Sequence, residues 1–320
     1  MPGSLRDTDV RRTIFIAAIE SILETHENLN IIFSKLNLER VRYFICSDIK
    51  LINIITGIQS SSSKHPCPYC NSSNIKDFDT ASNYRTIGSN KQSALAFETA
   101  GSVKKDAKLY TNCINQPLLT DDDNALIIDI CVPPELHLMQ GIVKHIYDNM
   151  AKDWPGVSVW LDKIHVKQKD YHHGAFVGND CRKLLKNTDL LQSIAEEKNI
   201  HTVAKYVHIF RCLNKVIVSG FGMTLDSQFE SNISEFKDVY VNLGISITPK
   251  VHILVNHVPY FLNKHNRPLG WYSEQALEST HYDFSKNCWE KQRFKRQLGH
   301  PDYAKNLKRA VIVYSSRNLS

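Results

Sequence analysis

Two cysteines and two histidines have the types and the spacing of a zinc site. His252 and His257 form an H-x4-H pair, a spacing used by the histidine half of tetrahedral zinc sites. The chain's C-x2-C motif, Cys67 and Cys70, could supply the thiolate half. A C-x2-C turn in a reducing compartment is either half of a zinc site or a redox pair. The adjacent prolines, and the lack of a preceding thioredoxin-like strand–helix unit, favour zinc.

The four residues can meet only if the chain folds back over a long distance. No histidine lies between Cys70 and His137, which excludes a self-contained zinc finger. On an ideal helix, residues five apart point about 140° away from each other, so His252 and His257 reach one metal only if their helix ends there. Pro259 favours such an end. Zinc binding would then make the segment between residues 67 and 252 an insertion.

Asp48 follows a short apolar segment and precedes a helical pattern. Residues 41–46 (VRYFIC) are rich in β-branched and aromatic side chains and predict a buried strand, and apolar residues at helical spacing follow from Leu51 to Ile58. An aspartate at this point lies at the carboxyl edge of a sheet, where α/β folds place reactive groups. An aspartate that only caps the following helix is the more common explanation, and both interpretations remain open.

Three further residues could join Asp48. Glu274 and Glu278 have the i,i+4 spacing that puts both carboxylates on one face of a predicted short helix. Zinc binding would carry Glu278 back towards Asp48. His137 begins a helix predicted over residues 135–150, just after a second predicted strand at residues 125–131 (ALIIDIC). A surface histidine remains the more common explanation for His137.

The rest of the chain is predicted to be helices and loops that position these residues. Helical periodicity marks residues 9–36 and 201–218, a helix is predicted around 93–99, and a basic helix opens near Arg182. Residues 71–124 are otherwise polar. Neither repeats nor long linkers occur, so the chain is predicted to form one continuous body.

Composition fits a globular protein with an acidic partner. The 320 residues are 42% apolar and 22% charged, with a net charge of +6. Irregularly placed cysteines, and the absence of a secretory signal or a long apolar span, predict a soluble intracellular protein without membrane contact. The positive charge weakly favours nucleic acid. Basic residues gather near the end of the chain, and the DNA-binding candidates are Lys291, Arg293, Lys295 and Arg296.

Taken together, these residues resemble the catalytic core of the V(D)J recombinase and its Transib-type transposon relatives, which belong to the DDE (RNase H-like) transposases. The resemblance spans most of the chain. Its motifs, all in the family's order, are the Asp48 unit, Cys67-x2-Cys70, Leu136-His137, Gly178-Asn179, Val251-His252 to His257-Val258-Pro259, Gly270-Trp271 to Ser273-Glu274, and Glu278-Ser279.

The resemblance implies a role for each matching residue. It makes Cys67, Cys70, His252 and His257 the ligands of one structural zinc ion, Asp48 the second catalytic aspartate and Glu278 the catalytic glutamate. The Ser-Glu and Glu-Ser motifs are one residue further apart than in the family, so Glu274 remains an alternative. His137 is a possible accessory residue. Two Mg²⁺ ions, held by carboxylates and DNA phosphate, would activate the attacking oxygen and stabilise the leaving one.

The resemblance also implies a fold: an α/β, mostly helical protein with an incomplete RNase H-like core, interrupted by a large zinc-stapled helical insertion. The expected parts are a partial core at 1–59, a zinc-binding helical insertion at 60–268 that includes a core strand near 125–131, and a segment with Glu278 and the basic residues at 269–320. The family's first catalytic aspartate precedes the helix at 9–36, and Asp7 and Asp9 cannot replace it. We therefore expect an incomplete or decayed transposase that is inactive as it stands.

Three functions are compatible with these features. The first is a transposase core, active only with the first strand and aspartate restored. The second is a non-catalytic protein of transposon origin that keeps its zinc and binds DNA. The third is a zinc-stabilised interaction scaffold without a nucleic-acid partner. For the first two the resemblance implies a nuclear protein that binds DNA and could form a homodimer.

Overall fold

The computed structural model describes residues 23–36, 38, 41–59, 63–73, 78, 83–169, 175–273, 284 and 301–318. Residues 9–22 of the first predicted helix lie outside this part of the chain, and helix α1 is described from His26–Leu36. Glu274 and Glu278 also lie outside it. So do the DNA-binding candidates Lys291, Arg293, Lys295 and Arg296.

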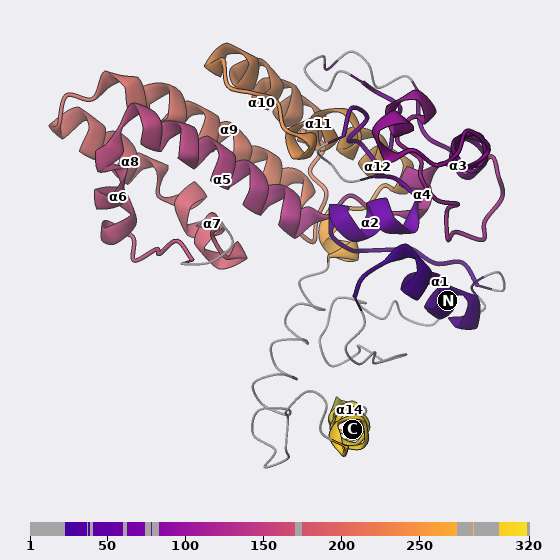
Figure 1. The fold of residues 1–320 in the computed structure, drawn as a ribbon. Coiled ribbons are helices and arrows are strands. Elements are labelled where there is room, and N and C mark those ends of the chain that lie inside the picture. The colour runs from indigo at the N-terminus through magenta and orange to yellow at the C-terminus, as the bar shows by residue number, and fades with distance from the viewer. Residues whose placement is uncertain are drawn as a thin grey trace.

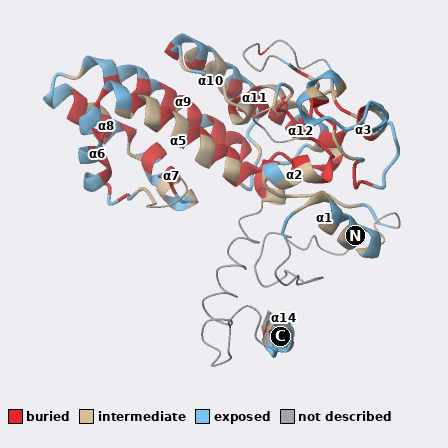
Figure 2. Ribbon diagram, viewed as in Figure 1, coloured by how far each residue is buried: buried red, intermediate tan, exposed pale blue. Residues whose placement is uncertain are grey.

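A body of antiparallel helices forms one half of the molecule (Figure 1). Its long members are α5 (Glu135–Asp153), α9 (Ala204–Gly220) and α10 (Phe229–Leu243), and α9 packs against both of the others. The facing sides of α5 and α9 are buried along most of their length (Figure 2). The helices predicted over 135–150 and 201–218 are therefore confirmed, because their apolar residues do form one buried face.

Shorter helices pack against α5 and α9 or against one another. They are α6 (Ser158–Lys163), α7 (Gly178–Lys186), α8 (Thr188–Glu197) and the 3₁₀ turns η5 (Pro155–Val157) and η7 (His201–Val203). Helix α14 (Tyr303–Asn318) follows near the end of the chain. Among the described residues, no helix combines the length and the apolar character needed to cross a bilayer.

The other half joins early and late parts of the chain. The early elements are α1, α2 (Ile49–Ile55), α3 (Ile87–Thr99), η4 (Lys104–Tyr110) and α4 (Ile127–Ile130). The late elements are α11 (Pro249–Asn256), α12 (Val258–His265) and η8 (Leu269–Tyr272). Figure 1 shows α11 and α12 among the early elements, although some 200 residues separate them from α2 in the chain.

The predicted α/β core is wrong. The described residues contain no β-strand, only isolated bridges. Residues 41–46 are extended, but only Ile45 bridges to Cys131, with its N–H donating to the carbonyl of Ile130 at 2.8 Å. The second predicted strand, 125–131, contains the short helix α4 instead. A short apolar run looks the same whether it is a buried strand or a buried helical turn, because every side chain is apolar in both.

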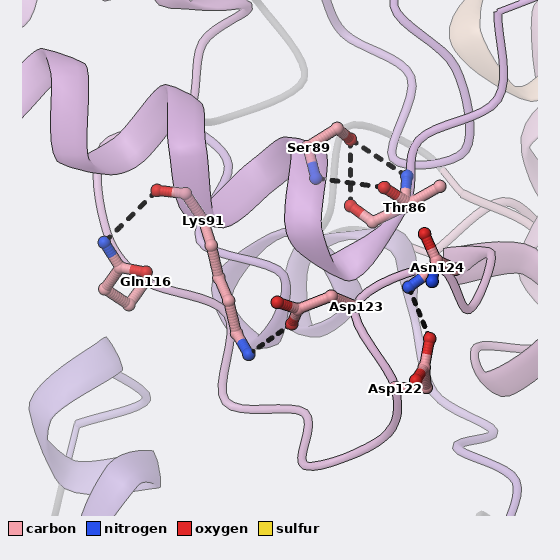
Figure 3. Close-up of polar contacts among 7 residues, drawn as sticks. All are labelled: Thr86, Ser89, Lys91, Gln116, Asp122, Asp123 and Asn124. Atoms are coloured by element: carbon pink, nitrogen blue, oxygen red, sulfur yellow. Dashed lines mark hydrogen bonds and ion pairs between the residues drawn. The ribbon is translucent and has the colours of Figure 1, made fainter.

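Polar contacts fix the loop that precedes α4 to the start of α3 (Figure 3). Thr86 caps α3, and its side chain and that of Ser89 each accept a hydrogen bond from the other residue's backbone N–H, both at 2.9 Å. Lys91 forms an ion pair with Asp123 at 2.7 Å. This capping box fixes the backbone at the start of α3, directly after Arg85.

Candidate metal centre

Cys67, Cys70, His252 and His257 lie together, and all four side chains are fully buried. The Sγ of Cys67 is 3.2 Å from Nε2 of His257, and the Sγ of Cys70 is 3.3 Å from Nε2 of His252. These pairs are 190 and 182 residues apart in the chain. The four donor atoms lie within 4.8 Å of one another. The predicted meeting of the two motifs is confirmed.

The distances fit a tetrahedral zinc ion. Bond lengths of about 2.3 Å to sulfur and about 2.0–2.1 Å to nitrogen would place two nitrogens about 3.3 Å apart and a nitrogen about 3.5 Å from a sulfur. The Nε2 atoms of His252 and His257 are 3.3 Å apart. Zinc bound by two thiolates and two neutral imidazoles has no net charge, which suits a fully buried site.

A break between two helices brings both histidines to this point. Helix α11 ends at Asn256, and α12 begins at Val258 with Pro259 in its first turn. His257 lies between the helices, with φ −114° and ψ −34°. The helix end that Pro259 predicted is confirmed, because proline lacks the N–H that a continuous helix would use at that position.

Buried groups surround the ligands. The N–H of Tyr69 donates to the Sγ of Cys67 at 3.4 Å, and the hydroxyl of Tyr69 donates to the carbonyl of Val132. The rings of Tyr69 and Tyr84 lie 5.5 and 5.4 Å from the ring of His257. These rings and the neighbouring core exclude water, so the arrangement has the closed character of a structural zinc site.

The second nitrogens of the two histidines have different surroundings. The side-chain amide of Asn256 lies 3.0 Å from Nδ1 of His252. The atom at this distance is Nδ2. When zinc binds Nε2, the Nδ1–H needs an acceptor, which the amide oxygen of Asn256 would supply after a 180° rotation of the side-chain amide. Nδ1 of His257 is buried without a hydrogen-bond partner among the described residues. Asn256 therefore orients His252, whereas the rings of Tyr69 and Tyr84 pack against His257.

The ionisation of the two thiols is coupled. Burial raises the pKa of Cys67 well above its usual value. The hydrogen bond from the Cys67 thiol lowers the pKa of Cys70, and the histidines lower it further. Burial also lowers the pKa of His257, which keeps its imidazole neutral. A zinc ion would bind both sulfurs as thiolates and would therefore displace the proton that the raised pKa favours on Cys67.

Asp48 is the N-cap of α2. Its Oδ1 accepts a hydrogen bond from the N–H of Leu51 at 2.7 Å. The helix-cap interpretation is confirmed, and the sheet edge at which Asp48 was expected does not exist among the described residues.

Asp48 and His137 nevertheless line one pocket. A cavity of about 500 Å³ lies between the start of α2, the first half of α5 and the start of α11. Three lysines share its lining: Lys50, Lys144 and Lys250. The first pairs with Glu24 at 2.8 Å, and the second pairs with Asp148. Two carboxylates, Asp48 and Asp148, also line the pocket, so its lining exceeds neutrality by a single positive charge.

Helix α11 links the pocket to the metal centre. Thr248 and Lys250 lie at the pocket, and His252 lies half a turn later at the metal. The stem of Lys250 crosses the backbone of α5 at Gly141, where an added Cβ would lie 2.2 Å from Cδ of the lysine. A side chain at residue 141 would therefore displace Lys250.

The predicted magnesium site has no support among the described residues. The four zinc ligands are the only group of three or more potential ligands that gathers there. Glu278 and the alternative Glu274 lie outside the described residues, so their distance from Asp48 is not defined.

Sequence reasoning missed two residues of the metal centre. Asn256 stands four residues after His252, a spacing that could have indicated the contact on a helix. Arg85 is buried, and its side chain donates to the carbonyls of both cysteines. No motif in the sequence indicated Arg85, because its partners are backbone atoms.

The comparison with protein families gives one match. Residues 4–94 match a family model described as a domain of unknown function (DUF8703). The match includes Cys67, Cys70 and Asp48 but neither histidine of the metal centre. No curated protein matches the chain.

Proposed function

We propose that the chain is a zinc-stabilised DNA-binding protein of transposon origin, as its resemblance to the DDE transposases implies. The observation that supports this most directly is the position of the pocket. Asp48 and His137, which the resemblance places at an active site, line it together with Lys250, and Lys250 stands on the helix that carries His252. Zinc would thus hold a wall of the DNA-binding pocket.

The proposed role of zinc is structural. The four ligands come from two distant segments, and each is fully buried. A closed four-ligand site leaves no position for a substrate or an activated water. When bound, zinc would join α11 and α12 to the turn at residues 67–70. The test is metal analysis of the purified protein, which should contain one zinc per chain.

The proposed ligand of the pocket is DNA phosphate. Its three lysines outnumber its two aspartates by one charge, and Lys250 lies beside the N-terminus of α11, which Thr248 caps. Lysines and helix N-termini both favour phosphate oxygens. Such contacts are independent of sequence and weaken steeply with salt, because each releases counterions from the DNA.

A fluorescence anisotropy titration of a labelled duplex tests this proposal. Binding should weaken between about 50 and 200 mM salt, and Lys250→Gln should reduce the slope of log affinity against log salt by about 1. The matched controls are Lys163→Gln on α6 and Lys198→Gln directly after α8. Each removes one exposed charge. Absence of salt-dependent binding would instead favour an interaction scaffold.

A second candidate function is Mg²⁺-dependent DNA cleavage. The shared pocket of Asp48 and His137 favours it, because the resemblance makes Asp48 a catalytic residue and His137 a possible accessory residue. The measurement is nicking of supercoiled plasmid in the presence of Mg²⁺ by a chain to which the family's first strand and aspartate have been added, because the chain alone is expected to be inactive. Asp48→Asn and Glu278→Gln should each abolish nicking, whereas Asp162→Asn, an exposed change on α6, should not. Nicking that survives Glu278→Gln would exclude the catalytic assignment.

A further inference from the structure

Arg85 is a fully buried arginine beside the candidate zinc site. Its Nε donates to the carbonyl of Cys67 at 3.1 Å and to the carbonyl of Cys70 at 3.0 Å. Its Nη2 donates to the carbonyl of Thr111 at 2.8 Å. Its Nη1 faces Oδ1 of Asn90 at 3.4 Å. Among the described residues, no carboxylate forms an ion pair with Arg85.

We infer that Arg85 is the positioning residue of the zinc site. By donating to both cysteine carbonyls, it fixes the turn at residues 67–70 in the form that presents both sulfurs to the histidines. The inference rests on the proposed zinc binding and adds a residue to it. Arg85 itself does not contact the metal position, since its hydrogen-bond partners are carbonyl, amide and hydroxyl oxygens and the thiol of Cys113.

The turn is held from its two sides. On the sulfur side, the N–H of Tyr69 donates to the Sγ of Cys67 at 3.4 Å. On the carbonyl side, Arg85 donates through its side chain, and its own backbone N–H donates to the carbonyl of Tyr69 at 2.9 Å. Three carbonyls of one turn thus accept hydrogen bonds from a single residue. Loss of these bonds would free the turn to rotate its sulfurs away from His252 and His257.

The surroundings fix Arg85 in turn. Its carbonyl accepts a hydrogen bond from the N–H of Ile127 at 3.0 Å. The next residue, Thr86, is held by the capping box of α3 (Figure 3). Asn90, which accepts from Arg85, donates to the carbonyl of Thr56 at the end of α2. Arg85 therefore connects the metal site to α2, α3 and α4.

The position requires arginine rather than any cation. A buried charge is costly unless hydrogen bonds satisfy it, and the planar guanidinium can donate in several fixed directions at once. Lysine has a single ammonium group on a flexible stem and cannot reach the carbonyls of Cys67, Cys70 and Thr111 together. The charge alone would therefore not reproduce the effect.

Zinc affinity of the full chain, measured by competition with a chromophoric chelator, tests the inference. Arg85→Met and Arg85→Lys should each weaken zinc binding by about 10–100-fold, the loss typical when a group that orients a metal ligand is removed. Cobalt substitution supplies a second readout, because the visible absorption of Co²⁺ reports tetrahedral geometry. Both variants should show a weaker or shifted band.

Arg182→Met is the matched control. Arg182 pairs with the buried carboxylate of Glu135 at 3.0 Å on the other side of α5, and its loss should destabilise the fold without changing zinc affinity. Unchanged zinc affinity and cobalt spectrum in Arg85→Met would overturn the inference, and so would full retention of both in Arg85→Lys. If Arg85→Met does not fold, the decision rests on Arg85→Lys. A wild-type protein that binds no zinc would instead refute the proposed function itself.

Discussion

The two halves of the molecule share one apolar core, but they differ in the contacts that are added to it. The helical body of α5, α9 and α10 buries large apolar side chains such as Phe210, Leu213 and Phe236, each fully buried. The half that joins early and late elements, called the metal half below, shares this apolar core through residues such as Val251, Leu254 and Phe261. It adds directional contacts: four metal-ligand side chains and the hydrogen bonds of Arg85. Each buried apolar side chain contributes its own share of stability, so the loss of one removes only that share. A tetrahedral metal site requires all four ligands at once.

This difference implies that the halves respond to different perturbations. Removal of metal should loosen the junction of α11 and α12 with the turn at residues 67–70, and leave the contacts within the helical body intact. Loss of a large apolar side chain should lower the stability of the body and leave the metal ligands in place. Each prediction below tests whether the halves are separable in this way.

The largest effect is expected from loss of a metal ligand. Cys70→Ser should abolish stoichiometric zinc binding, because serine is a poor zinc ligand and structural zinc contributes about 10–16 kcal/mol in small zinc-dependent domains. Hydrogen exchange should then increase at residues 63–73 and 249–265 before it increases in α9. Cys212→Ser, at a buried thiol of α9, is the control and should keep its zinc. Equal exchange in both halves would show that they are one unit.

A smaller effect is expected in the helical body. Phe210→Ala removes a fully buried ring that lies 5.9 Å from the ring of Trp160, and it should cost about 3–5 kcal/mol of unfolding free energy. Urea denaturation measures this loss. The zinc content should remain one per chain, because Phe210 lies in the helical body and is not part of the metal centre. The control Val218→Ala changes an exposed residue of the same helix and should cost less than about 0.5 kcal/mol.

Lower pH should affect the metal half first. Burial lowers the pKa of His257 below its usual value of 6.5, so the unfolded state takes up the proton at a higher pH than the folded state. The contribution of His257 to stability is therefore complete above pH 6.5 and is lost as the pH falls below it. Protons also compete with zinc for the ligands, which acts in the same direction.

The measurement is chelator-induced zinc release as a function of pH. Release should accelerate between about pH 7 and pH 5.5, the range in which histidine takes up its proton. Exchange in α9 should change little over this range. Zinc release that is independent of pH would contradict the assignment of His257 as a ligand.

How far the sequence predicts each half follows from the same contrast. The long helices of the body were predictable because their apolar residues recur at helical spacing, as in α5 and α9. The metal centre was predictable because the C-x2-C and H-x4-H motifs each indicate a ligand type, and Pro259 indicated the helix break between the histidines. Metal ligands can be predicted from the sequence when their residue types and their spacing are typical of such a site.

The prediction of a sheet was wrong because the two segments on which it rested lack a pattern that identifies a strand. Residues 41–46 and 125–131 are apolar without a period, so nothing in them separates a strand from a buried helical turn. The structure settles the choice through tertiary contacts: Ile127, Ile128 and Ile130 are buried in the turn α4. The segment forms two isolated bridges among the described residues, from Ile45 to Cys131 and from Thr86 to Leu126, and no strand. Arg85 was missed because it recognises backbone carbonyls, which leave no mark in the sequence.

The smallest expected effect concerns Thr86, the cap of α3. Thr86→Ala removes one capping hydrogen bond of 2.9 Å and should cost about 0.5–2 kcal/mol. Because Thr86 directly follows Arg85, part of this cost should appear as weaker zinc binding. Ser193→Ala on α8, whose hydroxyl donates to the carbonyl of Asp189, should leave zinc affinity unchanged. If Thr86→Ala lowers the unfolding midpoint but not zinc affinity, the cap stabilises α3 alone. Residues after Arg85 would then make no contribution to the zinc site through this cap.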